Sequence, residues 1–112
     1  MKRNLLKIMF AVVALFGATA VSAKTVKAKI FVNGKCDHCK ERIEKTALDI
    51  KGVSAAVWNQ QNKQLLLKYN PEKTDTVSIE KALVKVGHDA GNFKATDNAY
   101  NALPACCHYD RK

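Results

Sequence analysis

The chain has 112 residues, of which 47% are hydrophobic and 26% are charged, the proportions of an ordinary globular protein. This composition disfavours wholesale disorder, a collagen-like repeat and a membrane protein with several spans. The length is enough for one compact domain with one core, but not for two domains or for a large multi-part enzyme site.

Residues 1–23 have the three parts of a signal peptide: a basic start, an apolar stretch over residues 8–16, and the small residues Val21-Ser22-Ala23. We expect cleavage after Ala23. The Lys-rich start predicts bacterial export, so the mature protein is expected in an oxidising periplasm or outside the cell. The apolar stretch is shorter than the roughly 20 residues of a membrane span, so the mature form is not expected to cross the membrane.

The mature chain is predicted to be basic. Three of the 19 basic residues lie before position 24 and all ten acidic residues lie after it, so residues 24–112 carry a formal charge of +6. This charge is compatible with nucleic acid, an anionic lipid surface or an acidic partner. Export removes the usual nucleic-acid targets, and aromatic side chains are sparse among the basic ones, so no nucleic-acid partner is expected.

The first predicted strand covers residues 25–32, where apolar and polar side chains alternate. Asn33-Gly34 ends this alternation. Apolar side chains then recur at helical spacing, which predicts a helix over residues 37–50 that is closed by Gly52. These side chains are Cys39, Ile43, Ala47 and Ile50.

Two short strands, over residues 53–58 and 64–69, are expected to form a hairpin through the polar residues between them. A second amphipathic helix follows, with Asp75 or Thr76 as its N-cap and Gly87 just beyond its last apolar position. Its apolar positions are Ile79, Ala82, Leu83 and Val86.

A weaker extended stretch over residues 90–95 would complete the order β-α-β-β-α-β. This order predicts an α+β, ferredoxin-like sandwich in which two helices cover one face of a four-stranded antiparallel sheet. We expect the domain to span residues 24–96. Residues 97–112 then form a short cysteine-containing tail, with a helical turn before Pro104.

Cys36 and Cys39 are separated by two residues and lie where the first loop passes into the first helix. Both sulfurs are therefore expected at a helix N-terminus, where unpaired amides and the positive dipole end favour thiolates. With Lys35 and Lys40 alongside, such surroundings can bring a cysteine pKa from about 8.5 to roughly 3.5 to 7.5. Two thiolates at this spacing can chelate one soft ion. CxxC pairs also serve in redox exchange and in structural disulfides.

Three segments extend this pattern through both helices: VNGKCDHC, RIEKTALDIKGVSAAVWN and KALVKVGHDAG. Together with the element order, they resemble the heavy-metal-associated domain over about residues 25–95. That family includes soluble copper chaperones, periplasmic mercury-binding proteins and the metal-binding modules of P-type ATPases. The resemblance implies that Cys36 and Cys39 bind a soft cation, most often Cu(I), and pass it to a partner by ligand exchange.

The loop departs from the Gly-Met-Thr-Cys-x-x-Cys that is usual in this family, because Asn33 stands at the Gly position and Gly34 at the Met position. That Met normally packs beneath the loop, so the resemblance does not fix the rigidity of this one. Gly87-His88 matches a Gly followed by an aromatic residue or Lys, at a position that folds beside the metal loop. The neutral imidazole of His88 is therefore a candidate third ligand.

The tail adds three candidate ligands in a row, Cys106, Cys107 and His108. With the CxxC pair they could form a four-ligand zinc site, or shield a Cu(I) or Hg(II) ion from solvent. The alternative is that the two tail cysteines oxidise with each other or bridge to the first pair. His38 is interpreted as a helix residue that faces solvent.

The leading hypothesis is an exported binding protein, not an enzyme, that captures a soft metal ion. Cu(I) is favoured, with Hg(II) or Zn(II) as alternatives, and the ion is buffered or delivered to a membrane metal transporter or another metal-binding domain. A second hypothesis is a periplasmic thiol-disulfide oxidoreductase that uses the CxxC, although Pro71 and Pro104 are poorly placed to face the dithiol. A third is a small structural domain stabilised by disulfides or zinc.

Overall fold

The computed structural model describes residues 24–111, so the expected signal peptide and its cleavage after Ala23 lie outside the described residues. None of the helices between residues 24 and 111 has the length and apolar character that a membrane span requires. The elements, in chain order, are β1 (Val26–Phe31), α2 (Asp37–Leu48), β2 (Val53–Trp58), β3 (Gln64–Tyr69), α3 (Thr76–Lys85), α4 (Asp97–Asn101) and the 3-10 turn η1 (Ala105–Cys107).

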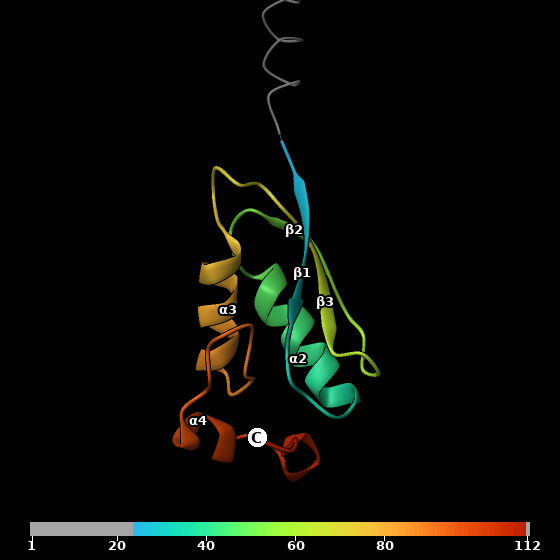
Figure 1. Ribbon diagram of the computed structural model, residues 1–112, viewed down its shortest axis with the longest axis vertical. Helices are drawn as coiled ribbons and strands as arrows, with labels where there is room; N and C mark the ends of the chain where they lie inside the picture. The colour runs from blue at the N-terminus through green and yellow to red at the C-terminus, as the bar shows by residue number, and fades with distance from the viewer. Residues whose placement is uncertain (1–23, 112) are drawn as a thin grey trace, which may run out of the picture.

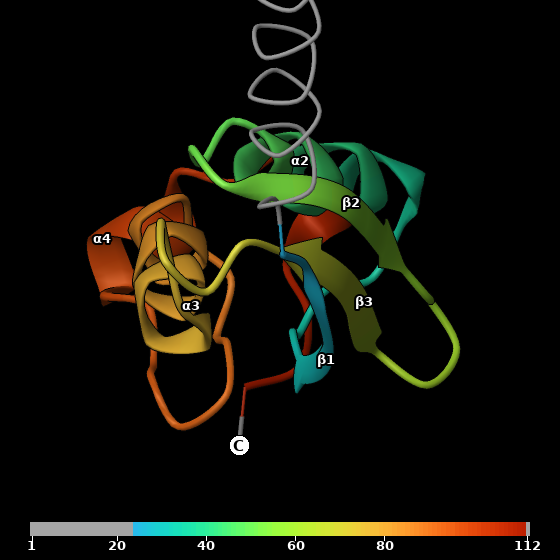
Figure 2. The same ribbon diagram turned by 90° about the horizontal axis from the view of Figure 1, so that it is seen from above.

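The three strands form one antiparallel sheet in the order β1-β3-β2. The β2 and β3 strands have the predicted bounds. They pair from Val53↔Tyr69 to Trp58↔Leu65, with one irregularity between Val53 and Ala55. Figures 1 and 2 show α2 beside β2, with α3 as the neighbour of α2. The α+β, ferredoxin-like architecture is therefore confirmed, with both helices on one face of the sheet.

Alternation along the strands explains why only one face is covered. The strand side chains that are buried beneath the helices are Ile30, Ala56, Trp58, Leu65 and Leu67. Val57 and Leu66 point the other way and are about half exposed, at 54% and 46%. The helices contribute Cys39, Ile43, Ala47, Ile79 and Leu83, all fully buried, so the predicted apolar stripes form the core.

The helix ends follow from local chemistry. The Asp75 carboxylate accepts the Ser78 N–H at 2.7 Å and caps α3, which makes Asp75 rather than Thr76 the N-cap. Gly52 and Gly87, just beyond the two helices, have φ values of +104° and +107°, which favour glycine. The last turn of α2 tightens, because the Ile50 N–H donates to the Ala47 carbonyl, and α2 therefore ends before the predicted position.

The predicted fourth strand over residues 90–95 is wrong as a strand of the described sheet. Ala90 makes isolated bridges to Val32 and to Phe93. The Ala90 N–H donates to the Phe93 carbonyl at 3.0 Å, and the Phe93 N–H donates back at 2.9 Å. The backbone thus reverses through Gly91, whose φ is +57°, instead of continuing along β1.

The C-terminal segment returns to the start of α2. The helical turn predicted before Pro104 is present as α4, whose N-cap Thr96 accepts the Ala99 N–H at 3.1 Å. After Pro104, η1 packs against α2. Figure 1 shows α4 and the tail at the same end of the molecule as the first turn of α2. This end carries the cysteines.

Candidate metal centre

The loop between β1 and α2 is supported from below by Trp58. The indole Nε1–H donates to the Val32 carbonyl at 2.9 Å, and the Lys63 ammonium donates to the Gly34 carbonyl at 2.6 Å. A Cβ on Gly34 would lie 3.0 Å from the Trp58 ring and 3.2 Å from the Cys39 Cβ. Trp58 therefore fills the space beneath the loop, and a side chain at position 34 would crowd its ring.

Four sulfur atoms meet above this loop. Cys36 is the N-cap residue of α2, and Cys39 lies in its first turn with their Sγ atoms 3.6 Å apart. The Cys36 Sγ is also 3.3 Å from the Sγ atoms of both Cys106 and Cys107, which η1 brings in from the other end of the chain. The two tail sulfurs are 4.0 Å apart, and all four cysteines are free.

These separations suit ligands of one soft ion. A metal-sulfur distance of about 2.3 Å places the sulfurs of a tetrahedral site about 3.8 Å apart, and the four measured separations run from 3.3 to 4.0 Å. The Sγ atoms of Cys36, Cys106 and Cys107 all lie within 4.8 Å of one another, and Cys39, which is outside this group, is joined to it through its 3.6 Å contact with Cys36. The donor set is sulfur alone, which favours Cu(I), Hg(II) and Zn(II) over hard cations.

The two helix cysteines have opposite acidities. Burial raises the pKa of Cys36, but its hydrogen bonds with the Cys39 backbone and with the thiols of Cys106 and Cys107 outweigh burial and lower that pKa to about 6. Burial and the contact with Cys107 raise the pKa of Cys39 to about 11. Without an ion, near pH 7, the partly exposed Cys36 is the thiolate and the buried Cys39 keeps its proton.

Arg42 places a positive charge in contact with one of the tail sulfurs. Its Nη1 lies 3.4 Å from the Cys107 Sγ and 3.4 Å from the His88 Nε2. The sequence pattern gave no role to Arg42, although it stands three residues after Cys39 and so on the same side of α2. Its positive charge offsets the negative charge that accumulates when several thiolates bind one ion.

His88 is fully buried behind Arg42. Its Nδ1 lies 2.8 Å from the Asn33 carbonyl, which can only accept, so Nδ1 carries the proton and Nε2 presents its lone pair towards Arg42. Burial and then the Arg42 charge lower the pKa of His88, which keeps the ring neutral. The structure thus places a neutral imidazole beside the site, while direct ligation by His88 stays a prediction.

The other two histidines lie apart from the sulfurs. The His108 ring stacks on Tyr100 with centroids 4.9 Å apart, and its Nε2 is buried with no hydrogen-bond partner in the described part of the chain. Neither His88 nor His108 belongs to the described set of ligand atoms within 4.8 Å of one another. His38 is exposed on α2, as expected.

The comparisons with known sequences point to one family. Residues 29–89 match the model of the heavy-metal-associated domain. A copper-exporting P-type ATPase of Staphylococcus epidermidis is 35% identical over 65 residues, which are 57% of this chain and 8% of the ATPase. A copper-exporting P-type ATPase of Staphylococcus aureus is 34% identical over 70 residues, 62% of this chain and 9% of the ATPase. The chain therefore spans less than a tenth of the length of these relatives.

Solved structures give the same architecture. The CopZ metallochaperone is 29% identical with a TM-score of 0.56, over 58% of this chain and 98% of its own. A second structure is the N-terminal domain of a potential copper-translocating P-type ATPase from Bacillus subtilis, solved in the Cu(I)-loaded state. It is 29% identical with a TM-score of 0.58, over 66% of this chain and 94% of its own.

Oxidised MerP from Ralstonia metallidurans is 22% identical with a TM-score of 0.58, over 61% of this chain and 96% of its own, and this likeness concerns the fold alone. The family match covers more than half of the chain, and its CxxC lies inside the matched residues. The chain therefore belongs to the heavy-metal-associated domain family, as a metal-binding and non-catalytic domain that carries an added cluster of cysteines.

Proposed function

We propose that this protein is an exported carrier or buffer for one soft heavy-metal ion, Cu(I) in preference to Hg(II) or Zn(II), with Cys36 and Cys39 as the primary ligands. The observation that carries the proposal is the pair of free sulfurs, 3.6 Å apart at the N-terminus of α2, in a member of a metal-binding family. The signal-peptide pattern of residues 1–23 supports the periplasm or the cell exterior as its location.

Cu(I) is the proposed cargo for two reasons. Thiolates are soft ligands, and the described cluster of candidate ligand atoms contains sulfur and no carboxylate or imidazole. The two Staphylococcus ATPases are described as copper-exporting, and the Bacillus subtilis domain at 29% identity was solved in a Cu(I)-loaded state. Mercury and zinc are the competing cargoes, since Hg(II) also prefers sulfur and Zn(II) accepts four thiolates.

The ion is proposed to enter and leave from the side of Cys36. Cys39 is fully buried, whereas Cys36 is partly exposed and has the lower pKa, about 6. A thiolate at the surface captures an ion first, and the buried thiol then gives up its proton and closes the chelate. An incoming thiolate of a partner reaches the ion from this exposed side of the site.

The proposed recipient is a membrane metal transporter or another metal-binding domain with an acidic docking surface. Residues 24–112 carry a formal charge of +6, and the basic Lys35 lies next to Cys36. Complementary charges of this kind speed the encounter of two proteins more than they strengthen the final complex. The acidic surface brings the recipient to the exposed side of the site.

A Cu(I) competition titration tests the proposed ligands. The chain from residue 24 onward, which contains the whole described core, is reduced without oxygen and titrated against a Cu(I) chelator. The Cys36→Ser/Cys39→Ser variant is expected to lose the tight ion. The matched control is His38→Ala, which lies between the two cysteines on the exposed side of α2 and should keep it. Equal Cu(I) affinity in the wild type and the double serine variant would overturn the proposal.

A further inference from the structure

We propose that the C-terminal tail is a latched wall of the metal site, so that the ion is enclosed by the sulfurs of Cys36, Cys39, Cys106 and Cys107 and is retained instead of being released quickly. The proposal rests on the proposed function and adds the ligand number and the device that holds the tail in place. The latch consists of Tyr109 and Arg111, with Tyr100 and Asp89 as their main partners on the domain.

The sulfur geometry places the tail on the open side of the CxxC pair. Cys36 is the shared neighbour, because its Sγ is 3.6 Å from Cys39 and 3.3 Å from each tail sulfur. Cys107 is fully buried and contacts the Arg42 guanidinium, whereas Cys106 is exposed. An ion between these sulfurs has the buried Cys39 and Cys107 inside and Cys106 towards the solvent.

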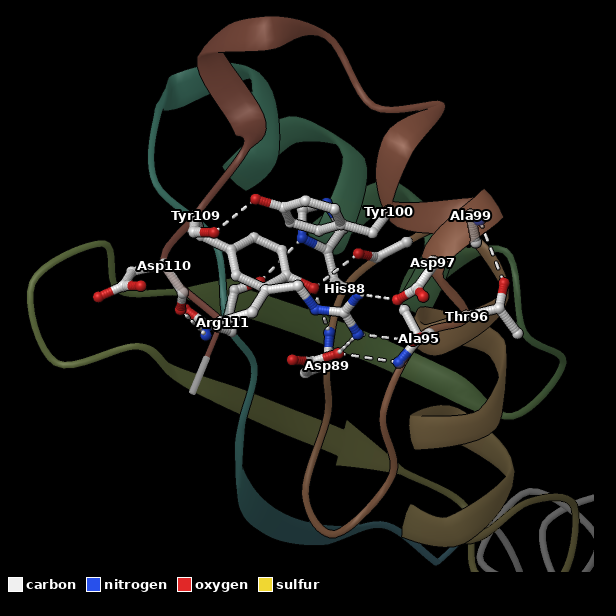
Figure 3. A network of polar contacts seen from close by, with 12 residues as sticks. His88, Asp89, Ala95, Thr96, Asp97, Ala99, Tyr100, Tyr109, Asp110 and Arg111 are labelled. Carbon is white, nitrogen blue, oxygen red and sulfur yellow. Dashed lines mark hydrogen bonds and ion pairs between the residues drawn. The ribbon is translucent and has the colours of Figure 1, made fainter.

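Tyr109 fixes the tail immediately after the two cysteines. Its hydroxyl donates to the Gly87 carbonyl at 2.8 Å and accepts the Asp89 N–H at 3.0 Å, so both functions of the hydroxyl are used. Its own carbonyl accepts the Tyr100 hydroxyl at 2.6 Å. The ring is 3% exposed and stacks on His88. Figure 3 shows this network between the tail and the segment after α3.

Arg111 makes the second half of the latch. Its guanidinium contacts the Asp89 carboxylate at 3.1 Å, the Ala95 carbonyl at 2.6 Å and the Asp97 carboxylate at 3.2 Å. The same group lies over the Tyr100 ring at 4.7 Å, and Figure 3 shows it at the centre of these partners. Asp89 is 5% exposed, so this ion pair is better shielded from water than a surface pair.

None of these latch contacts involves a sulfur atom. The tail is therefore held beside the CxxC pair before any ion arrives, which lowers the entropy lost when the tail thiols become ligands. It also keeps those thiols at a high effective concentration near the ion, so a sulfur that dissociates from the ion rebinds before a competing ligand takes its place. Each thiol that binds releases its proton to water.

The test combines ligand number with rate of loss. The reduced chain from residue 24 onward, loaded with one Cu(I), is studied by X-ray absorption to count sulfur neighbours and by Cu(I) transfer to a chromophoric chelator. The wild type should show three or four sulfurs. Cys106→Ser/Cys107→Ser should show two and lose Cu(I) faster, and a weakened latch, Arg111→Met or Tyr109→Phe, should also release it about 10-fold to 100-fold faster.

A metal-free measurement tests the latch by itself. Cys107 is fully buried, so its alkylation by iodoacetamide should be slow in the wild type and faster in Arg111→Met and Tyr109→Phe. The matched control is Lys45→Met, which removes a cation that pairs with Asp49 at 3.5 Å on the exposed side of α2. It should leave both the alkylation rate and Cu(I) release unchanged.

The outcomes separate this inference from the proposed function. Two sulfur neighbours in the wild type, or equal Cu(I) release with and without the tail thiols, would overturn the latched wall while leaving the CxxC carrier intact. The carrier function itself would be contradicted if the wild type bound no Cu(I), or if the ion stayed bound after Cys36 and Cys39 were replaced. Equal Cys107 alkylation in the wild type and both latch variants would also overturn the latch.

Discussion

At the scale of single residues, local patterns in the sequence predict some members of the site and not others. Cys36 and Cys39 were found because their spacing and their place before a helix are both visible in the sequence. The sequence pattern does not give the partners of Arg42, Tyr109 and Arg111, because their contacts join residues 9 to 65 positions apart in the chain. Such contacts depend on the path of the tail, which no local pattern predicts.

Trp58 provides a residue-scale prediction. Trp58→Phe keeps an aromatic ring under the loop but removes the Nε1–H that donates to the buried Val32 carbonyl. Leaving that acceptor unpaired should lower the free energy of unfolding of the metal-free protein by about 1 to 3 kcal/mol. Urea denaturation measures the change. Val57→Ala, on the exposed face of the same strand, should cost less, and an equal loss in both variants would contradict the supporting role of Trp58.

At the scale of elements, the alternation and helical spacing that predicted β2, β3 and α3 reflect a core in which each element buries one face. The fourth strand failed because its backbone groups have other partners. The Gly91 N–H donates to the Phe31 carbonyl, but the Ala95 N–H goes to the Asp89 carboxylate and the Ala95 carbonyl to Arg111. Residues 90–95 therefore contact the tail instead of a neighbouring strand. In the sequence, the Gly91-Asn92 pair is the local feature that indicates a turn here.

The cap of α3 gives a prediction about pH. Hydrogen bonding from Ser78 lowers the pKa of Asp75 below its usual value in the folded protein. The contribution of this carboxylate to stability is therefore fully present above its unfolded pKa of about 3.9 and is lost as the pH falls through the lower folded value. Asp75→Asn keeps a capping oxygen but cannot titrate. Its free energy of unfolding should fall less steeply than that of the wild type below about pH 4, and identical slopes would contradict this assignment.

At the scale of the described molecule, a heavy-metal-associated domain over residues 29–89 is followed by a tail that folds back to the start of α2. The family likeness covers residues 29–89 and stops before Cys106 and Cys107. Fold and primary pair were therefore accessible from the resemblance, whereas the position of the tail required the three-dimensional structure. Two more sulfurs near the pair change the expected behaviour from quick exchange towards retention, which suits a buffer or a carrier that releases only to a matched recipient.

One measurement tests the central claim most directly. The reduced chain from residue 24 onward is offered equal amounts of Cu(I), Zn(II) and Hg(II) under a competing chelator, and its mass is read by native mass spectrometry. We predict that each chain holds one Cu(I) and that this ion disappears in Cys36→Ser/Cys39→Ser. A protein that holds no ion, and whose cysteines instead cycle readily between dithiol and disulfide, would contradict the metal-carrier function and favour redox chemistry.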